Sequence, residues 1–391
     1  MIWINFLHFY QSPVTSDEVI HEVVKSSYQP WVKFLNKYKK VKVTVNFSAC
    51  LTERLFNLGY GKLLKDYARL AKRGQIEFVS SAAFHSILPL LPKKETIKQI
   101  QINDQINKNR FGAAYKPTGF FLPELAYSKN VAKIIKKLKY KYIILDEISY
   151  AGKLNSQIDN NLKYKIKNIG INIIFRNRII SRSFVPETII NIIEGRDKRF
   201  NIDNKNRFII TATDAELYGH RYWNWHPAFS FLVDKLKIKT LTISEYLKSL
   251  KKERTVEPIA SNWESIEEEL KRGLPYGLWY DPKNKIQKLL WQLANFALEL
   301  NYKSEKDENH FASRLHLEKG LASCTFWWAS NRDFRLFGPP AWHPEEIEKG
   351  AAELLASVRS LTNITPNQKL KAEKLFSQIR DLVWNTHWNN K

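Results

Sequence analysis

The chain has 391 residues, of which 44% are hydrophobic, and a formal net charge of +23. It contains no run of about 18 uncharged apolar residues, so we expect no membrane-spanning helix. Met1–His8 is expected to form a first strand rather than a signal peptide. The two cysteines, Cys50 and Cys324, lie far apart in no C-x-x-C pattern, which favours a reducing cytoplasm.

The positive charge raises the hypothesis of a nucleic-acid binder, because basic surfaces attract phosphate. However, the lysines are spread over helical segments, for example Lys62 and Lys65 on one and Lys133 and Lys136 on another. The sequence also has no zinc-finger, RNP-like or helix-turn-helix pattern. We therefore interpret most of the charge as solvated surface and expect no nucleic-acid partner.

Seven short apolar segments, rich in β-branched and aromatic residues, are typical of strands that are buried on both faces. In chain order they are Ile2–Leu7, Val41–Phe47, Gln75–Ser80, Thr118–Leu122, Tyr142–Leu145, Ile171–Phe175 and Phe208–Thr213. Because helical segments alternate with these strands, we predict an α/β fold with parallel strands.

The helical segments between the strands carry the usual start and stop signals. They are Val19–Tyr38 with a kink or an end at Pro30, Leu63–Arg73 before Gly74, Thr96–Phe111 before Gly112, and Ser128–Leu138. Residues 150–170 and 178–206 are polar, and we predict long loops there. Lys237–Lys251 gives a weaker strand-helix signal.

After residue 257 the strands stop and helical periodicity continues. The predicted helices are Trp263–Arg272, Asn284–Leu300, Phe311–Trp328, Glu345–Leu361 and Pro366–Trp384. We therefore predict two domains, an α/β domain over residues 1–257 and a helical region over residues 258–391 that packs on it.

Polar or ionisable residues follow the predicted strands, where a barrel of parallel strands carries its active site. Glu124 follows the fourth strand, and Asp214, Glu216 and His220 follow the seventh. A retaining glycosidase needs a nucleophile and an acid/base, with the two carboxyl groups about 5–5.5 Å apart. Glu124 and Asp214 come from different strands, so the fold could unite them, and we predict that they form such a pair.

Each of these residues also has a structural interpretation. A single histidine after a strand more often makes a loop hydrogen bond than takes part in catalysis, and Glu124 could simply begin a helix. We expect His8, His85 and His220 to bind sugar hydroxyls or to hold the carboxylates. Arg176 is expected to keep one carboxylate ionised.

Five segments resemble the motifs of glycoside hydrolase family 57, in the family's order. They are His8–Pro13, Gly74–Leu91, Gly119–Glu124, Thr213–His220 and Leu321–Ser330. The resemblance implies that Glu124 is the nucleophile and that Asp214 is the acid/base. It also implies a distorted (β/α)₇ barrel of the glycoside hydrolase/deacetylase type, followed by a C-terminal helical bundle that lends side chains to the cleft.

The family's activities include α-amylase, 4-α-glucanotransferase and branching enzyme, so the resemblance implies an α-glucan substrate without naming the reaction. It implies no cofactor and no obligatory metal. We predict a hydrolase, with a transferase or a branching enzyme as the alternative. The predicted substrate-binding residues are His8, Gln11, His85, Arg176, Glu216, His220, Trp279, Trp327 and Trp328; for the three tryptophans, helix packing is an equally good interpretation.

Three positions depart from the family pattern: Ala215 stands in place of Gly, Cys324-Thr325 in place of Ser-Asp, and Arg182 in place of Asp. They motivate a further alternative, a non-catalytic glycan-binding relative. A metal-dependent deacetylase is disfavoured, because the chain has no Asp-Asp dipeptide and its closest histidine pairs are six residues apart. Oligomeric state cannot be read from the sequence.

Overall fold

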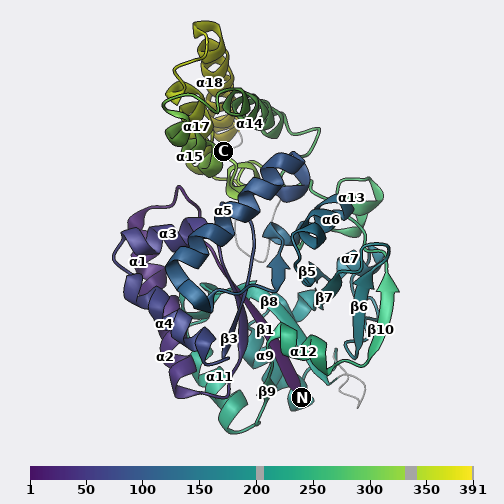
Figure 1. Cartoon of the computed structure of the whole chain (residues 1–391). Helices are drawn as coiled ribbons and strands as arrows, with labels where there is room; N and C mark the ends of the chain where they lie inside the picture. The colour runs from purple at the N-terminus through teal and green to yellow at the C-terminus, as the bar shows by residue number, and fades with distance from the viewer. Residues whose placement is uncertain (200–206, 331–340, 390–391) are drawn as a thin grey trace. The chain divides into compact units, whose positions relative to one another are not determined.

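The computed structural model describes residues 1–199, 207–330 and 341–389, which form two compact units (Figure 1). The first unit consists of Met1–Gln11, Thr15–Ala83 and Leu88–Lys271, and the second of Ser12–Val14, Phe84–Ile87 and Arg272–Lys391. Residues 258–271 thus belong to the first unit. The backbone there is tied to it, since Ile259 N donates to Ser149 O at 2.8 Å and Tyr127 N to Ser261 O at 2.8 Å.

The first unit contains two five-stranded sheets (Figure 1). In the first sheet all pairs are parallel, in the order β3-β2-β1-β8 with β9 beside β1. Its strands are β1 (Ile2–Phe9), β2 (Val43–Phe47), β3 (Ile76–Val79), β8 (Phe208–Asp214) and β9 (Lys239–Thr240). The second sheet has the order β10-β6-β7-β5-β4 and is parallel except between β6 and β7. Its strands are β4 (Gly119–Phe121), β5 (Tyr142–Asp146), β6 (Leu162–Ile166), β7 (Asn172–Arg176) and β10 (Lys252–Val256).

Backbone hydrogen bonds join the two sheets at two places. Ser80 N donates to Gly119 O at 3.0 Å and Phe121 N donates to Ser80 O at 2.8 Å, which links β3 to β4. At the other side, Asn177 N donates to Ile210 O at 2.9 Å and links the end of β7 to β8. The seven predicted strands are thus all present and follow one another in hydrogen-bonded order. Their closure into a barrel stays a prediction, which these bonds support.

The alternation of side chains decides which residues face the space between the sheets. Ile4 and Phe6 of β1 share one apolar cluster with Phe121 of β4 and with Ile210 and Ala212 of β8. Trp3, Leu7 and Phe9 of β1 pack instead in a second cluster, which includes residues of the helices of the first unit. By the same period of two, His8 and Asp214 continue the inner face of their strands.

Helices of the first unit connect these strands. They are α1 (Asp17–Val23), the π-helical turn η1 (Val24–Tyr28), α2 (Gln29–Lys37), α3 (Ala49–Asn57), α4 (Gly61–Lys72), α5 (Lys93–Phe111), α6 (Lys129–Lys137), α7 (Ile148–Ala151), α8 (Arg178–Ser181), α9 (Val185–Ile193), α10 (Leu217–His220), α11 (Trp225–Asp234), α12 (Ile243–Ser249) and α13 (Glu267–Lys271). Gly112, with φ 62°, ends α5 as predicted. Ser128 Oγ accepts from Val131 N and caps the start of α6.

The second unit is helical. It contains α14 (Lys285–Lys303), α15 (His310–Gly320), α16 (Ser323–Trp327), α17 (Pro344–Ser360) and α18 (Pro366–Asn389). Two glycines allow its helices to approach closely: a Cβ at Gly320 would lie 2.6 Å from the Leu354 side chain, and one at Gly350 would lie 2.4 Å from Thr325 Oγ1. Thr325, which departs from the family pattern, is therefore a buried packing residue.

Several predictions about connections were wrong. Residues 150–170 contain β6 rather than only a loop, because the alternation Leu-Lys-Tyr-Lys-Ile suits a half-buried strand beside β7. Residues 178–199 contain α8 and α9, while residues 200–206 lie outside the described part of the chain. The helix predicted over Trp263–Arg272 is limited to α13, so Trp263 precedes it in an irregular segment.

Candidate active site

His8 lies at the carboxyl end of β1, with its ring on the inner face. Its Nδ1 is 2.8 Å from Asn46 Oδ1 at the end of β2, and its ring centroid is 4.5 Å from that of Phe121 on β4. Burial lowers the pKa of His8 to about 3, so the imidazole is neutral at ordinary pH. A neutral, buried imidazole can bind a sugar hydroxyl but cannot serve as the proton donor.

Asp214 is the last residue of β8 and the register partner of His8. Burial raises the pKa of Asp214 to about 6; the charges of Arg176 and Arg221 oppose this shift, and Glu264 adds to it. Ala215 N donates to His8 O at 2.8 Å, which fixes the backbone after the carboxyl group. A carboxyl group that keeps its proton near pH 6 is suited to general acid catalysis.

Glu216, two residues further on, is partly buried and close to Asp214. Burial, followed by the charge of Asp214, raises its pKa well above the ordinary value of a glutamate. Two carboxyl groups so close together resist simultaneous ionisation, and their titrations belong to the pair. The pair of carboxyl groups, Asp214 and Glu216, therefore keeps a proton over a wide range of pH.

Glu124 lies three residues beyond Phe121, in the short turn Pro123–Leu125. Its φ of 58° and the φ of 49° at Leu125 place two consecutive non-glycine residues in the left-handed region. Such conformations cost free energy and cluster at functional sites. The side chain is buried, since only 7% of Glu124 is exposed.

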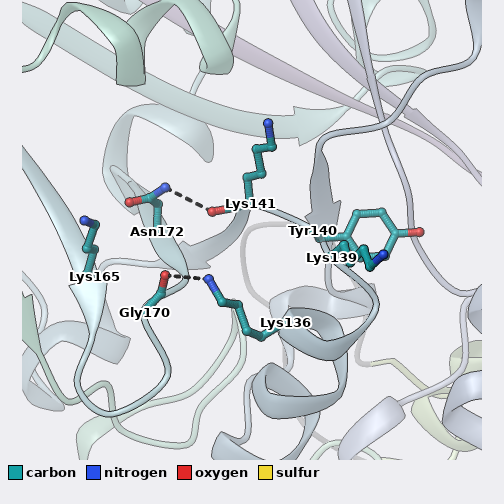
Figure 2. A pocket seen from close by; sticks show the side chains of 7 residues that line it. All are labelled: Lys136, Lys139, Tyr140, Lys141, Lys165, Gly170 and Asn172. Carbon is teal, nitrogen blue, oxygen red and sulfur yellow. Dashed lines mark hydrogen bonds between the residues drawn. The ribbon is translucent and has the colours of Figure 1, made fainter.

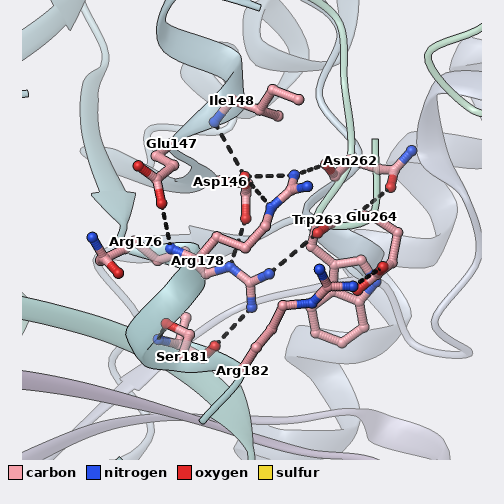
Figure 3. A network of polar contacts seen from close by, with 12 residues as sticks. Asp146, Glu147, Ile148, Arg176, Arg178, Ser181, Arg182, Asn262, Trp263 and Glu264 are labelled. Carbon is pink, nitrogen blue, oxygen red and sulfur yellow. Dashed lines mark hydrogen bonds and ion pairs between the residues drawn. The ribbon is translucent and has the colours of Figure 1, made fainter. Parts of the chain in front are cut away.

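Trp263 and Glu264 follow one another in the chain and contact Arg176 and Arg182, respectively (Figure 3). Trp263 N donates to Glu124 O at 3.0 Å, and Arg176 donates to Trp263 O at 3.3 Å with its guanidinium 5.3 Å from the indole centroid. Glu264 forms an ion pair with Arg182 and raises the pKa of Asp214. The segment thus contacts the Glu124 turn and influences Asp214.

Arg176 was predicted to keep one catalytic carboxylate ionised and to bind substrate. Its charge does oppose the raised pKa of Asp214, while its direct ion pair is with Asp146. Arg176 Nε donates to Asp146 Oδ2 at 2.8 Å, and Arg178 Nε donates to Asp146 Oδ1 at 2.9 Å (Figure 3). Arg176 also donates to Ala212 O on β8 at 2.9 Å. Arg176 acts on Asp214 only through its charge. The guanidinium itself is held in place by Asp146.

Sequence reasoning missed five residues that surround the pair: Tyr28, Asp146, Arg178, Trp263 and Glu264. Asp146 directly follows the predicted strand Tyr142–Leu145 without a predicted role, and Trp263 was assigned to a helix. For Trp263 and Glu264 the sequence did offer a usable signal, an irregular Ser-Asn-Trp-Glu segment between a strand and a helix. The burial of Arg178, of which 2% is exposed, has no sequence signal, because it depends on Asp146 from another strand.

The remaining predicted binding residues of the first unit lie in different surroundings. Gln11 is partly buried and lies beside the Tyr28 phenol. His220 is exposed, with its Nδ1 3.4 Å from Glu22 Oε1 on α1. The structure thus gives His220 a partner outside the inner face of the sheets.

Four predicted residues belong to the second unit. His85 Nδ1 is 2.9 Å from Ser323 Oγ, and Ser323 N donates to His85 O at 3.1 Å. Trp279 is fully buried and its carbonyl accepts from Trp291 Nε1 at 2.9 Å, which favours packing over sugar binding. Trp327 and Trp328 are half-buried, with ring centroids 4.4 Å apart.

A hollow of about 480 Å³ lies elsewhere, among Lys136, Lys139, Lys141, Lys165 and neighbours (Figure 2). Lys141 immediately precedes β5, and Asn172, which also lines the hollow, begins β7. The hollow is therefore at the amino ends of these strands, whereas Asp146 and Arg176 mark their carboxyl ends. It contains no carboxylate and is not the candidate active site.

In the described ranges, no group of three or more His, Cys, Asp and Glu side chains is arranged to hold a metal ion. Over the same residues, no helix combines the length and apolar character that crossing a bilayer requires.

The family described as "Glycosyl hydrolase family 57" matches residues 8–259. Alpha-amylase 1 of Dictyoglomus thermophilum is 25% identical over 218 residues, which cover 54% of this chain and 31% of that protein. 4-alpha-glucanotransferase of Thermococcus litoralis is 24% identical over 288 residues, which cover 68% of this chain and 42% of that protein. The chain thus spans less than half the length of these two curated relatives.

A solved structure shares the fold. The GH57-type branching enzyme from Pyrococcus horikoshii superposes with a TM-score of 0.69 at 18% identity, covering 96% of this chain and 94% of that chain. The family match covers well over half of the chain and includes Glu124, Asp214 and their strands. This chain therefore belongs to glycosyl hydrolase family 57.

Proposed function

We propose that this protein is a retaining glycoside hydrolase that acts on α-linked glucans, with Glu124 as nucleophile and Asp214 as acid/base. The observation that carries the proposal is the placement of Asp214 at the end of β8, opposite His8. Trp263, next to Glu264, donates its N–H to Glu124 O at 3.0 Å, and burial raises the pKa of Asp214 to about 6. Glycoside cleavage by this mechanism requires one carboxyl group that donates a proton and a second that attacks as a carboxylate.

In the first step of the proposed reaction, ionised Glu124 attacks the anomeric carbon while Asp214 protonates the departing oxygen. The bond between the anomeric carbon and that oxygen breaks, and a glycosyl ester forms on Glu124. Asp214, now ionised, is stabilised by the charges of Arg176 and Arg221. In the second step Asp214 takes a proton from the attacking hydroxyl, whose oxygen bonds to the anomeric carbon while the ester bond to Glu124 breaks, which regenerates the Glu124 carboxylate and protonated Asp214.

Water as the attacking hydroxyl gives hydrolysis, whereas a sugar hydroxyl gives transfer. Relatives named alpha-amylase and 4-alpha-glucanotransferase both match this chain at similar identity, so transfer or branching is the alternative within the proposal. We further propose that residues 1–257 form a (β/α)₇ barrel and that residues 258–391 lend side chains to its cleft. The two free cysteines are consistent with action in the cytoplasm.

A non-catalytic glycan-binding protein remains the second candidate, because Arg182 replaces an acidic residue of the family pattern. The structure offsets this change, since Arg182 forms an ion pair with Glu264. A carboxylate is thus present in this region even though its position in the sequence differs.

The product profile from maltoheptaose tests the proposal. Only shorter oligomers are expected for a hydrolase, and longer oligomers as well for a transferase. The Glu124→Gln variant should abolish both while it still binds the oligosaccharide. Binding without any turnover by the unmodified protein would favour the glycan-binding candidate, and neither binding nor turnover would contradict both.

A further inference from the structure

The segment that carries Asp214 is held by a part of the chain to which neither the family motifs nor the catalytic proposal assigns a role. This part is the π-helical turn η1, Val24–Tyr28, between α1 and α2. Sequence periodicity predicts one kinked helix here and gives no sign of the turn. π-helical turns are rare and frequently occur at functional sites.

The first contact is a hydrogen bond. Ser27 Oγ donates to Ala215 O at 2.7 Å, and both residues are fully buried. Ala215 N donates in turn to His8 O at 2.8 Å. The residue that follows Asp214 is therefore anchored through its N–H to β1 and through its carbonyl to η1, which restricts rotation of the backbone next to the acid.

The second contact is close packing at the other end of the same segment. Gly219 has φ +112°, and a Cβ built on it would lie 1.9 Å from Ser26 O. A side chain is excluded here both by the backbone conformation and by the carbonyl of η1. Tyr218 also packs edge-on against Trp31 of α2, with ring centroids 5.1 Å apart. Residues 214–219 are thus fixed to η1 and α2 at two separate points.

The turn also lies within electrostatic reach of the acid. The Tyr28 phenol is fully buried, and the charges of Glu216 and Asp214 add to burial in raising its pKa. Its backbone is itself held, because Tyr67 Oη donates to Tyr28 O at 2.8 Å. The turn η1, which contacts the Asp214 segment, is therefore bonded to α4 and is not a free helix end.

We propose that η1 is a positioning device for the acid/base, and that Ser27 and Gly219 are positioning residues that act through the backbone of Ala215 and of the following turn. This inference rests on the proposed role of Asp214. Proton donation to a leaving group contributes about 10²–10⁴-fold to such reactions and depends on the placement of the donor. Loosening η1 should therefore impair the step that needs the proton and spare one that does not.

Ser27→Ala, assayed with two substrates, separates these steps. Maltoheptaose has a poor leaving group that requires protonation, whereas 2,4-dinitrophenyl α-maltoside has a good one that requires little. We expect kcat/KM to fall about 10-fold to 100-fold for maltoheptaose and less than about 3-fold for the aryl maltoside. Gly219→Ala should show the same selectivity with a larger loss.

Ser313→Ala is the matched control. Ser313 Oγ also donates to a backbone carbonyl, that of Ser357, at 2.7 Å, and both residues are fully buried. Ser313 Oγ also accepts from Asn301 Nδ2 at 3.1 Å, so the control should lose at least as much stability as Ser27→Ala, without changing the ratio of the two rates. Equal losses on both substrates in Ser27→Ala and Gly219→Ala, or no loss in either variant, would overturn the inference.

Asp214→Asn distinguishes this failure from a failure of the proposed function. If Asp214→Asn is selective for maltoheptaose and the η1 variants are not, only the positioning role is wrong. If Asp214→Asn itself shows no selectivity, the acid/base assignment is wrong and the inference falls with it.

Discussion

Two aspartates end strands of the same unit, Asp146 fully buried and Asp214 partly buried, and their surroundings differ. Asp146, at the end of β5, accepts hydrogen bonds from Arg176, Arg178 and the backbone N–H of Ile148. At Asp214, at the end of β8, no side-chain hydrogen bond is found among the described residues. Its cations, Arg176 and Arg221, act only through their charge, and burial raises its pKa to about 6.

The comparison shows that strand-end position alone does not make a carboxyl group catalytic. Two guanidinium groups fully engage Asp146 and make it a structural support. Asp214 is left with few direct partners, so its proton is available for transfer. In the proposed mechanism Arg176 acts at both sites, since Asp146 fixes the cation whose charge would stabilise ionised Asp214.

The largest effect is expected from Asp214→Asn. The kcat/KM for maltoheptaose should fall about 10²–10⁴-fold, because Asn cannot donate the proton to the leaving oxygen. The free energy of unfolding should not decrease, since the variant removes a poorly solvated carboxyl group. Reducing-end release and urea unfolding measure the two quantities. Full activity in a folded variant would contradict the assignment of the acid/base.

Asp146→Asn, in contrast to Asp214→Asn, should lower the free energy of unfolding. Arg176 and Arg178 would remain buried without their counter-charge, so we expect a loss of about 3–5 kcal/mol in the free energy of unfolding. Urea unfolding measures it, with Asp214→Asn as the matched control at the other strand end. If Asp146→Asn cost less than about 1 kcal/mol, the distinction between a supporting and a reacting aspartate would not hold.

The dependence of stability on pH should also distinguish the two sites. The pKa of Asp214 is about 6 in the folded protein against its ordinary 3.8, so the native state binds more protons between these values. The contribution of Asp214 to stability is therefore greatest below about pH 4 and declines as the pH rises through 6, where Asp214 and Glu216 titrate as a pair. Asp214→Asn removes this decline. The free energies of unfolding of the unmodified protein and of Asp214→Asn, measured at pH 4 and pH 7, check this prediction. The same difference between the two proteins at both pH values would contradict it.

The smallest effect is expected from Glu264→Gln. Glu264 adds to the raised pKa of Asp214, so its neutralisation should lower that pKa. Activity that needs protonated Asp214 should then decline at a pH lower by a few tenths of a unit. The pH profile of kcat/KM measures the shift. Glu253→Gln, an exposed residue on β10, is the control and should leave the profile unchanged.

The strands could be predicted because a strand buried on both faces is a short run of apolar residues in the sequence. All seven predicted strands are present, whereas β6 was missed because its lysines resemble a loop. Glu124 and Asp214 could be proposed from their strand-end positions. The pairing of Arg182 with Glu264, and that of Asp146 with two arginines, could not, because these contacts join segments far apart in the chain.

The π-helical turn shows a different limit. One extra residue per turn does not disturb the apolar pattern of α1, η1 and α2 enough to be seen, so Ser27 is indistinguishable from any helical serine. Gly219 gave a weak signal as part of a motif. Its reason, contact with Ser26 O, becomes visible only when residues 193 positions apart are placed together.

The most direct test of the account is to trap the glycosyl-enzyme. The protein would be treated with 5-fluoro-α-glucosyl fluoride, digested and examined by mass spectrometry. The account predicts a single glycosyl label on the peptide that contains Glu124, and no label in Glu124→Gln. A label on Asp214 or Glu216, or turnover of the reagent by Glu124→Gln at the unmodified rate, would contradict it.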